Sequence, residues 1–172
     1  MASIRLGYDF YSRDVLVVAP ALLGQILVCK YPNRTTEKHI ITETEAYKGE
    51  EDMACHASKG KTDRNKVMYE KGGLIYVYLV YGMHWMLNFV TGRKNDPQAV
   101  LIRGIEGYNG PGKLTRFLKI DRSFYGEDLS ISKRIWIEPS LWKCKFETTA
   151  RIGIDYADEY WKNVPWRFVL KK

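Results

Sequence analysis

The segment Glu43–Tyr47, with the sequence ETEAY, holds the first group of residues that could form a catalytic site. It closes a run, residues 38–47, whose Ile, Thr and Tyr content predicts a β-strand. Alternate side chains of a strand share a face, so Glu43, Glu45 and Tyr47 are expected to point the same way. Two carboxylates and a phenol on one face can activate a water molecule and hold a planar ligand. The alternative is a solvated sheet edge, because an isolated Glu-x-Glu pair is a weak signal.

A β-hairpin with an aromatic tip is the second feature. Residues 74–80 and 85–90 are strand-like, and the glycine in the Tyr81–His84 connection permits a tight turn between them. An aromatic side chain at a hairpin tip exposes apolar area to water, which folding alone does not favour. Such a side chain, here Tyr81, suits a wedge pushed between stacked bases. The alternative, a tip folded back onto the domain, stays open at this point.

Three polar residues stand out because of their surroundings. Asn88 and Arg103 lie on apolar strands, where a polar side chain needs partners to offset the cost of burial. A buried Arg103 requires a carboxylate or a phosphate, and Glu45 or a DNA backbone are the natural candidates. His56 follows Cys55 in the polar loop after the first glutamate-bearing strand, and its simplest interpretation is a surface histidine.

The glycine-rich segment 110–114, with the sequence GPGKL, precedes a predicted helix over residues 113–119. Free backbone amides at the start of a helix, with Lys113 beside them, favour phosphate binding. Basic residues recur every three positions, at Lys113, Arg116 and Lys119, as expected for contacts with a nucleic-acid backbone. An ordinary solvated helix face explains the same spacing.

The elements that position these residues alternate between strands and short helices. The chain has 172 residues, 45% of them hydrophobic, which predicts one domain over residues 1–172. The pattern predicts an α+β fold around a mixed sheet. Further strands are predicted over 25–31, 99–105, 131–137, 149–154 and 166–170, and helical segments over 12–24 (with a kink or restart at Pro20), 62–69 and 156–162.

Composition excludes several classes of protein. No apolar run approaches the ~20 residues of a membrane span, and the first residues lack the apolar core of a secretory signal. The three cysteines are widely spaced, so neither a metal site nor a disulfide framework is expected, and a reducing compartment fits best. Residues 61–172 carry 20 basic and 12 acidic side chains, and the chain has 12 Tyr and 5 Trp. These properties favour a nucleic-acid partner, and a soluble surface that happens to be basic is the alternative.

Six blocks in order along the chain resemble the alkyladenine DNA glycosylase family, the 3-methyladenine DNA glycosylases without a helix-hairpin-helix. The blocks are ETEAY at 43–47, His56, TDRN at 62–65, LIYVYLVYGM at 74–83, VLIR at 100–103 and GPGKL at 110–114. The resemblance implies a single α+β domain with a curved, mostly antiparallel β-sheet, surrounding helices and a protruding β-hairpin. The chain departs from the usual pattern at Pro20, Cys55, Lys71-Gly72-Gly73 and Trp85.

The resemblance also implies a role for each matching residue. Glu45 matches the general base that activates the attacking water, and Arg103 matches the group that positions this carboxylate, the water and a phosphate. Asn88 matches the residue that opposes the exocyclic amino group of normal guanine. Tyr81 matches the side chain that intercalates where the base has left. The flipped base is expected between Tyr47, His56 and Tyr78, and the DNA backbone at Met83, Lys113 and Arg116.

The implied activity is that of a monofunctional DNA glycosylase. It would flip and hydrolytically excise 3-methyladenine, 7-methylguanine, hypoxanthine or ethenoadenine from double-stranded DNA, leaving an abasic site for base excision repair. Water is the expected nucleophile, with no cofactor, no metal and no membrane. A monomer in the cytoplasm or nucleoid, or in a eukaryotic nucleus, is expected. Two alternatives are a non-catalytic binder of damaged or bent DNA and a β-domain that binds RNA or single strands, and the pairing of Glu45 with Arg103 favours the enzyme.

Overall fold

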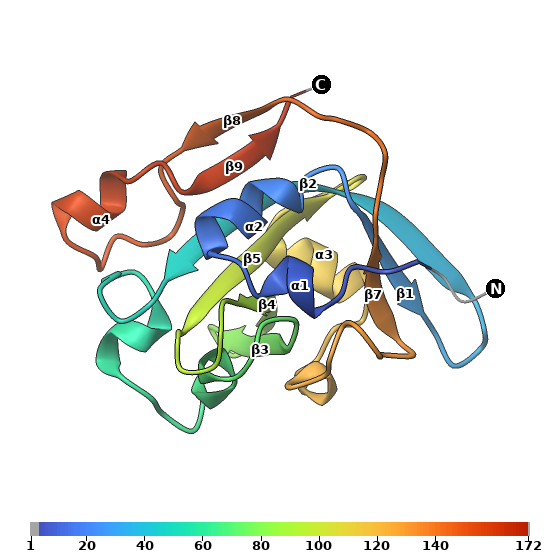
Figure 1. Ribbon diagram of the computed structural model, residues 1–172, viewed down its shortest axis with the longest axis horizontal. Helices are drawn as coiled ribbons and strands as arrows, with labels where there is room; N and C mark the ends of the chain where they lie inside the picture. The colour runs from blue at the N-terminus through green and yellow to red at the C-terminus, as the bar shows by residue number, and fades with distance from the viewer. Residues whose placement is uncertain (1–3, 172) are drawn as a thin grey trace.

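A curled, antiparallel β-sheet organises the computed structural model, which describes residues 4–171 (Figure 1). The main path of the sheet runs β3-β4-β5-β2-β1-β7, and every pairing between its strands is antiparallel. The strands are β1 (Ile26–Lys30), β2 (Thr36–Lys48), β3 (Ile75–Val80), β4 (His84–Thr91), β5 (Gln98–Ile105), β6 (Tyr108–Asn109), β7 (Ile135–Glu138), β8 (Phe146–Thr149) and β9 (Arg167–Leu170). The α+β class is confirmed, and so is the curved antiparallel sheet that the resemblance implies, whereas the mixed sheet predicted from the pattern is wrong.

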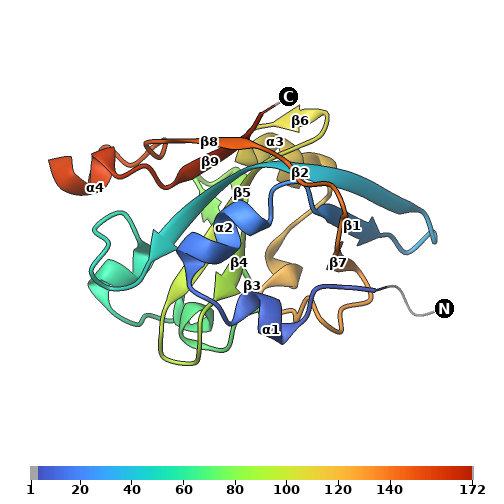
Figure 2. The ribbon, with the colours of Figure 1, turned by 45° about the horizontal axis from the view of Figure 1, so that its top comes forward.

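Short helices and 3-10 turns fill the connections. The helices are α1 (Tyr8–Tyr11), α2 (Val15–Ala21), α3 (Pro111–Phe117) and α4 (Glu159–Asn163), and the 3-10 turns are η1 (His56–Lys59), η2 (Lys66–Tyr69) and η3 (Arg122–Phe124). Helix α2 lies across β2 and β5 in both ribbon views, while α4 stands apart beside the β8–β9 hairpin (Figures 1 and 2). Asp14 caps α2 by accepting a hydrogen bond from the Leu16 amide at 2.8 Å.

The long strand β2 joins the two halves of the sheet. Its first residues pair with β1, with Ile40 opposite Ile26. Its later residues pair with β5 on one edge and with β9 on the other, so that Thr44 lies opposite both Ile102 and Phe168. The register shifts between Ile41 and Thr44, which bends the strand at the first glutamate of the ETEAY segment. As a result, a C-terminal hairpin comes to lie beside the central strands.

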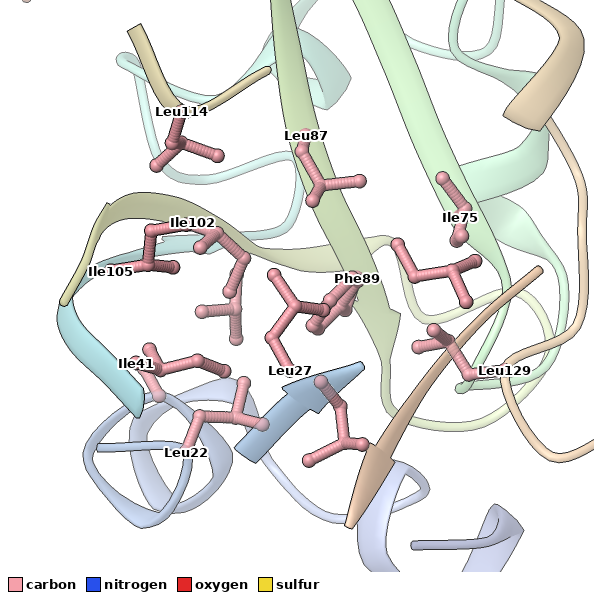
Figure 3. Close-up of a cluster of buried hydrophobic side chains, with 14 of the residues drawn as sticks. Leu22, Leu27, Ile41, Ile75, Leu87, Phe89, Ile102, Ile105, Leu114 and Leu129 are labelled. Atoms are coloured by element: carbon pink, nitrogen blue, oxygen red, sulfur yellow. The ribbon is translucent and has the colours of Figure 1, made fainter. Parts of the chain in front are cut away.

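Period-two alternation gives the sheet two different faces. Ile75, Leu87, Phe89 and Ile102 have no exposed surface and pack on one face with Leu27 (Figure 3). The intervening residues of the same strands, including Tyr76, Tyr78, Asn88, Leu101 and Arg103, line a cavity on the other face. The apolar core therefore fixes which side chains face the cavity, because a strand that buries one set must turn the other away.

Several predicted boundaries are wrong for identifiable reasons. The helix predicted over 12–24 is shorter, since Asp14 caps α2 immediately before Val15 and the helix ends at Ala21, with Pro20 in its last turn. The strand predicted over 131–137 begins only at Ile135, because residues before it form a turn in which the Ser132 hydroxyl accepts a hydrogen bond from the Ile135 amide. The strand predicted over 149–154 is not observed, because β8 already ends at Thr149 and irregular backbone follows.

The other predicted strands are confirmed to within two residues at each end. The helical segments predicted over 62–69, 113–119 and 156–162 are observed as η2, α3 and α4 with shifted ends. Lys119 ends the helical segment after α3 with a φ of 56°, a conformation outside the helix. No helix within residues 4–171 is long and apolar enough to cross a membrane.

Gly72 lies where backbone atoms leave no room for a side chain. A Cβ atom built on Gly72 would lie 2.4 Å from the Tyr11 carbonyl oxygen and 3.0 Å from that of Gly92. Both neighbours are backbone atoms, and the Gly72 and Gly92 amides hold them in place by hydrogen bonds of 3.0 and 2.9 Å. The α1 segment can therefore pack against the start of the β3–β4 hairpin only if residue 72 has no side chain.

We expect Gly72→Ala to lower the free energy of unfolding by about 2–4 kcal/mol, because backbone on two sides must move to admit the methyl group. The midpoint of urea denaturation measures the change. Gly7→Ala is the matched control, since a Cβ there meets no atom within 4 Å, and it should shift stability by no more than about 0.5 kcal/mol. Equal effects of the two substitutions would contradict the close approach.

Candidate active site

A cavity of about 520 Å³ opens on the polar face of the sheet. This volume lies in the range of roughly 300–1,000 Å³ typical of small-molecule sites. Six of the residues singled out from the sequence line it, namely Tyr47, His56, Tyr78, Tyr81, Asn88 and Arg103. They come from β2, β3, β4, β5, the hairpin tip and η1, so the strand pairing brings together residues that are up to 56 positions apart.

Glu45 lies directly behind the cavity wall with no exposed surface. Its Oε2 accepts a hydrogen bond of 2.7 Å from the Tyr47 hydroxyl, and its Oε1 accepts one of 2.8 Å from the Ile152 amide. Arg103 Nε lies 3.4 Å from Oε1. All three partners line the cavity themselves. Glu45 is thus a buried carboxylate held by donors from three separate segments.

Burial raises the pKa of Glu45, and the Arg103 cation together with the Ile152 and Tyr47 donors acts against the rise. A carboxylate with a raised pKa is a stronger base than one in water, and the three donors favour its ionised form. Burial also raises the pKa of Tyr47, with the Glu45 charge adding to the rise. The Tyr47 phenol therefore stays protonated and donates to Glu45.

Arg103 has a second carboxylate partner that sequence reasoning did not assign. Its Nε donates a hydrogen bond of 3.0 Å to Glu43 Oε1, closer than its approach to Glu45. Arg167 Nε donates to the same Glu43 oxygen at 2.6 Å. The predicted contact with Glu45 is present, but Glu43 is the nearer partner and links Arg103 to β9. Glu43, Glu45 and Tyr47 do share a face, as the strand pattern predicted.

Aromatic rings make up one part of the cavity wall. The His56 and Tyr78 ring centroids are 4.4 Å apart, and those of Tyr76 and Tyr78 are 5.2 Å apart. His56 Nδ1 lies 2.8 Å from the Tyr76 hydroxyl, within hydrogen-bond distance. His56 is therefore part of the cavity wall rather than a free surface histidine. Tyr76 was missed as a site residue, although its two-residue spacing from Tyr78 was the available signal.

Asn88 is fixed at the cavity wall by its own strand pair. It is 2% exposed, and its Nδ2 donates a hydrogen bond of 3.2 Å to the Tyr76 carbonyl. Because Nδ2 makes this hydrogen bond, the Oδ1 atom of Asn88 stays available as an acceptor in the cavity lining. The site can therefore present a hydrogen-bond acceptor to a ligand at this position.

The tip of the β3–β4 hairpin projects from the domain. Tyr81 is 90% exposed, and both Tyr81 and Gly82 have positive φ, 53° and 66°. A left-handed conformation costs a non-glycine residue roughly 1 kcal/mol, and exposure of the ring adds to the cost. The open question about the tip is answered, since it does not fold back. Met83 beside it is 65% exposed.

The two cations assigned to the DNA backbone on α3 lie outside the cavity. Lys113 and Arg116 are exposed, and Lys113 borders a separate cleft that Glu43 and Arg167 also line. Their contact with DNA stays a prediction. Within residues 4–171, no group of three or more His, Cys, Asp or Glu side chains could hold a metal ion. Cys29, Cys55 and Cys144 are free thiols.

Ile152 is the contact that the sequence could not indicate. Its donor to Glu45 is a backbone amide, so no side-chain pattern marks it. The segment was expected to be a strand, yet it leaves β8 after Thr149, and the positive φ of Gly153, 75°, belongs to a turn. Tyr156, two residues beyond Ile154, also lines the cavity and donates a 2.8 Å hydrogen bond to the Ala54 carbonyl.

Comparison with known proteins identifies the family of this chain. The model of the methylpurine-DNA glycosylase family matches residues 9–109 and 106–172. A protein of Desulfitobacterium hafniense is 44% identical over 97% of this chain and 95% of its own length. A protein of Methanocella arvoryzae is 43% identical over 96% of this chain and 92% of its own length. Both are named "Putative 3-methyladenine DNA glycosylase".

These matches define the chain as a DNA repair hydrolase that cleaves N-glycosidic bonds in damaged DNA. Within that class, it belongs to the methylpurine-DNA glycosylase family. The resemblance noted in the sequence is therefore confirmed, and so is the assignment to base excision repair.

His56 should make stability depend on pH. Burial, with the nearby Arg64 and Lys59 cations, lowers the pKa of His56 to about 4, against 6.5 in an unfolded chain. Between these values the unfolded chain binds a proton that the folded chain does not, so the free energy of unfolding falls as the pH falls. The loss attributable to His56 reaches up to about 3 kcal/mol at pH 4. Urea denaturation of the wild type and His56→Gln at pH 7, 5.5 and 4 measures it.

The wild type should lose more stability than His56→Gln over this range, because glutamine does not titrate. Using the difference between the two proteins removes the contributions of Glu45 and the other carboxylates, which titrate in both. Parallel stability curves would contradict the burial of a neutral His56.

Proposed function

We propose that this enzyme is a monofunctional glycosylase that flips an alkylated or deaminated purine into the cavity and hydrolyses its bond to the sugar. The observation that carries the proposal is a buried, hydrogen-bonded Glu45 beside a cavity walled by aromatic rings. Candidate bases are 3-methyladenine, 7-methylguanine, hypoxanthine and ethenoadenine. The domain over residues 1–172 acts as a monomer on double-stranded DNA, in the cytoplasm or nucleoid.

Glu45 is the general base in this proposal, and water is the nucleophile. Because the carboxylate has no exposed surface, the activated water must sit among its wall partners Tyr47, Arg103 and Ile152. As the bond to the base breaks, positive charge develops on the sugar, and an ionised carboxylate behind the wall stabilises it. Arg103 positions Glu45 and contacts the adjacent phosphate. No lysine lines the cavity among the described residues, which supports hydrolysis over a Schiff-base lyase step.

The aromatic wall suits a cationic base. Alkylation at N3 or N7 gives a purine a positive charge, which the faces of Tyr47, Tyr78 and a neutral His56 attract. The low pKa of His56, about 4, keeps this ring from adding a positive charge to the wall at neutral pH. Asn88 opposes the exocyclic amino group of normal guanine by its bulk, because the hydrogen bond to the Tyr76 carbonyl holds its side chain in the cavity wall. Neutral lesions such as hypoxanthine require protonation as they leave.

Tyr81 is the intercalating side chain in this proposal. Its exposure and its positive φ both act against folding, so another role must account for the residue. Insertion of the ring into the gap left by the flipped base supplies that role and stabilises the flipped state. Met83, Lys113 and Arg116 would then contact the DNA backbone on either side of the hairpin.

Glu45→Gln should slow base release by about 10²–10⁴-fold, the usual contribution of a general base, while lesion binding survives. The measurement is single-turnover release from duplexes with one hypoxanthine, ethenoadenine or 7-methylguanine. Glu37→Gln, on the same strand but at its far end, is the control and should release at the wild-type rate. Tight lesion binding without release by the wild type would favour the non-catalytic damage binder.

Tyr81→Asn should separate stability from function. Asparagine tolerates a left-handed conformation and exposes less apolar surface, so stability should be unchanged or higher by up to about 1 kcal/mol. Binding to a duplex with one ethenoadenine should weaken at least tenfold more than binding to the undamaged duplex. Fluorescence of the flipped base and parallel urea denaturation give the two values. Equal losses on both duplexes would argue against intercalation.

A further inference from the structure

A fully buried ion pair lies beneath the candidate site and belongs to neither the cavity lining nor the apolar core. Arg151 Nη1 donates to Asp52 Oδ2 at 2.6 Å, and Nη2 donates to Oδ1 at 2.9 Å. Both side chains are 0% exposed. Such a bidentate pair holds its two backbone segments in one relative orientation, because both distances must be satisfied together.

Arg151 contacts several elements at once. Its Nη1 also donates to the Ala46 carbonyl at 2.9 Å, and its Nη2 donates to the Trp161 carbonyl at 3.2 Å. The guanidinium lies 4.9 Å from the centre of the Tyr47 ring and 5.2 Å from that of Trp166. The arginine therefore connects β2, the 49–55 loop and the segments around α4.

Each contact of the pair lies next to a residue of the proposed machinery. Ala46 separates Glu45 from Tyr47 along β2, and Arg151 precedes the Ile152 amide that donates to Glu45. On the other side, Asp52 accepts the Lys48 and Ala54 amides, both at 3.0 Å, and so shapes the loop that leads to His56. The pair thus holds three backbone segments that carry residues of the cavity lining.

Stability alone gives little reason for a buried ion pair. Removing two charges from water is costly, and apolar residues of similar volume often serve a fold equally well. Arg151 Nε adds to the cost, because it is buried with no hydrogen-bond partner. What an apolar replacement would lack is the fixed orientation of several hydrogen bonds and a cation near the Glu45 carboxylate.

We propose that Arg151 and Asp52 are positioning residues for base excision, which hold the Ile152 amide on Glu45 and place a cation near that carboxylate. The inference rests on the proposed role of Glu45. Arg151 acts through the backbone of residue 152 and through its charge, and Asp52 acts by orienting Arg151. Neither residue is proposed to touch the substrate.

The test is the pH dependence of single-turnover release of 7-methylguanine by the wild type, Arg151→Gln, Arg151→Lys and Asp52→Asn. Loss of the cation and of the amide donor should raise the pKa of Glu45, so the acidic limb of the rate profile should move to higher pH in Arg151→Gln. We expect a shift of at least one pH unit and a loss of at least tenfold in rate at pH 7. Arg151→Lys keeps the positive charge, so its acidic limb should lie between those of the wild type and Arg151→Gln.

Leu129→Ala controls for loss of stability, because Leu129 is fully buried in the core and does not line the cavity. It should lower the thermal midpoint without moving the acidic limb. If Arg151→Gln does not fold, Asp52→Asn serves in its place, since asparagine keeps the size and one acceptor. It should move the limb in the same direction by a smaller amount. Folded variants whose limb stays at the wild-type pH would overturn the proposal, leaving the pair a structural role alone.

The Glu45→Gln experiment separates the two proposals. If Glu45→Gln releases bases at the wild-type rate, the proposed function of Glu45 fails and the acidic limb cannot be assigned to it. If Glu45→Gln abolishes release while the limb of the Arg151 variants is unmoved, only the positioning role fails.

Discussion

The burial of one carboxylate, Glu45, is the constraint on which the rest of the site depends. A charge with no exposed surface is tolerated only when donors surround it. Tyr47 supplies a hydroxyl from the same strand, Arg103 supplies a guanidinium from the neighbouring strand, and Ile152 supplies a backbone amide from a segment more than 100 residues later. The pairing of strand β2 with β5 and β9 brings these donors together. The sheet topology therefore sets which groups surround the carboxylate.

One face of the sheet forms the apolar core, and the other lines the candidate active site. One face is covered by apolar side chains that lie close together in the interior, as Leu87 and Phe89 do on β4 (Figure 3). The opposite face carries polar and aromatic residues that apolar packing does not require. The hairpin tip extends this division, because Tyr81 combines an exposed ring with a strained backbone. Costs to stability therefore gather where DNA is expected to bind, and the core on the other face offsets them.

The site is a network that extends beyond the cavity lining. Glu43 joins Arg103 to Arg167, and Asp52 joins Arg151 to the loop before His56. Through these two carboxylates, the C-terminal segments are attached to the strands that carry the first half of the site. The family match also extends through the C-terminal part of the chain, although the motifs visible in the sequence end near residue 114.

The sequence by itself determined the α+β class, most strands, the hairpin with its aromatic tip and the family, because alternation and short motifs are local properties. It also placed Glu45, Tyr47 and Arg103 among the residues of interest. Only the tertiary structure decided that Glu43 is the nearer partner of Arg103, that residues 150–154 are not a strand, and that a backbone amide and a buried Arg151–Asp52 pair hold the site. The physical reason is that a hydrogen bond between distant segments, above all one made by the backbone, leaves no periodic pattern in the residues that form it.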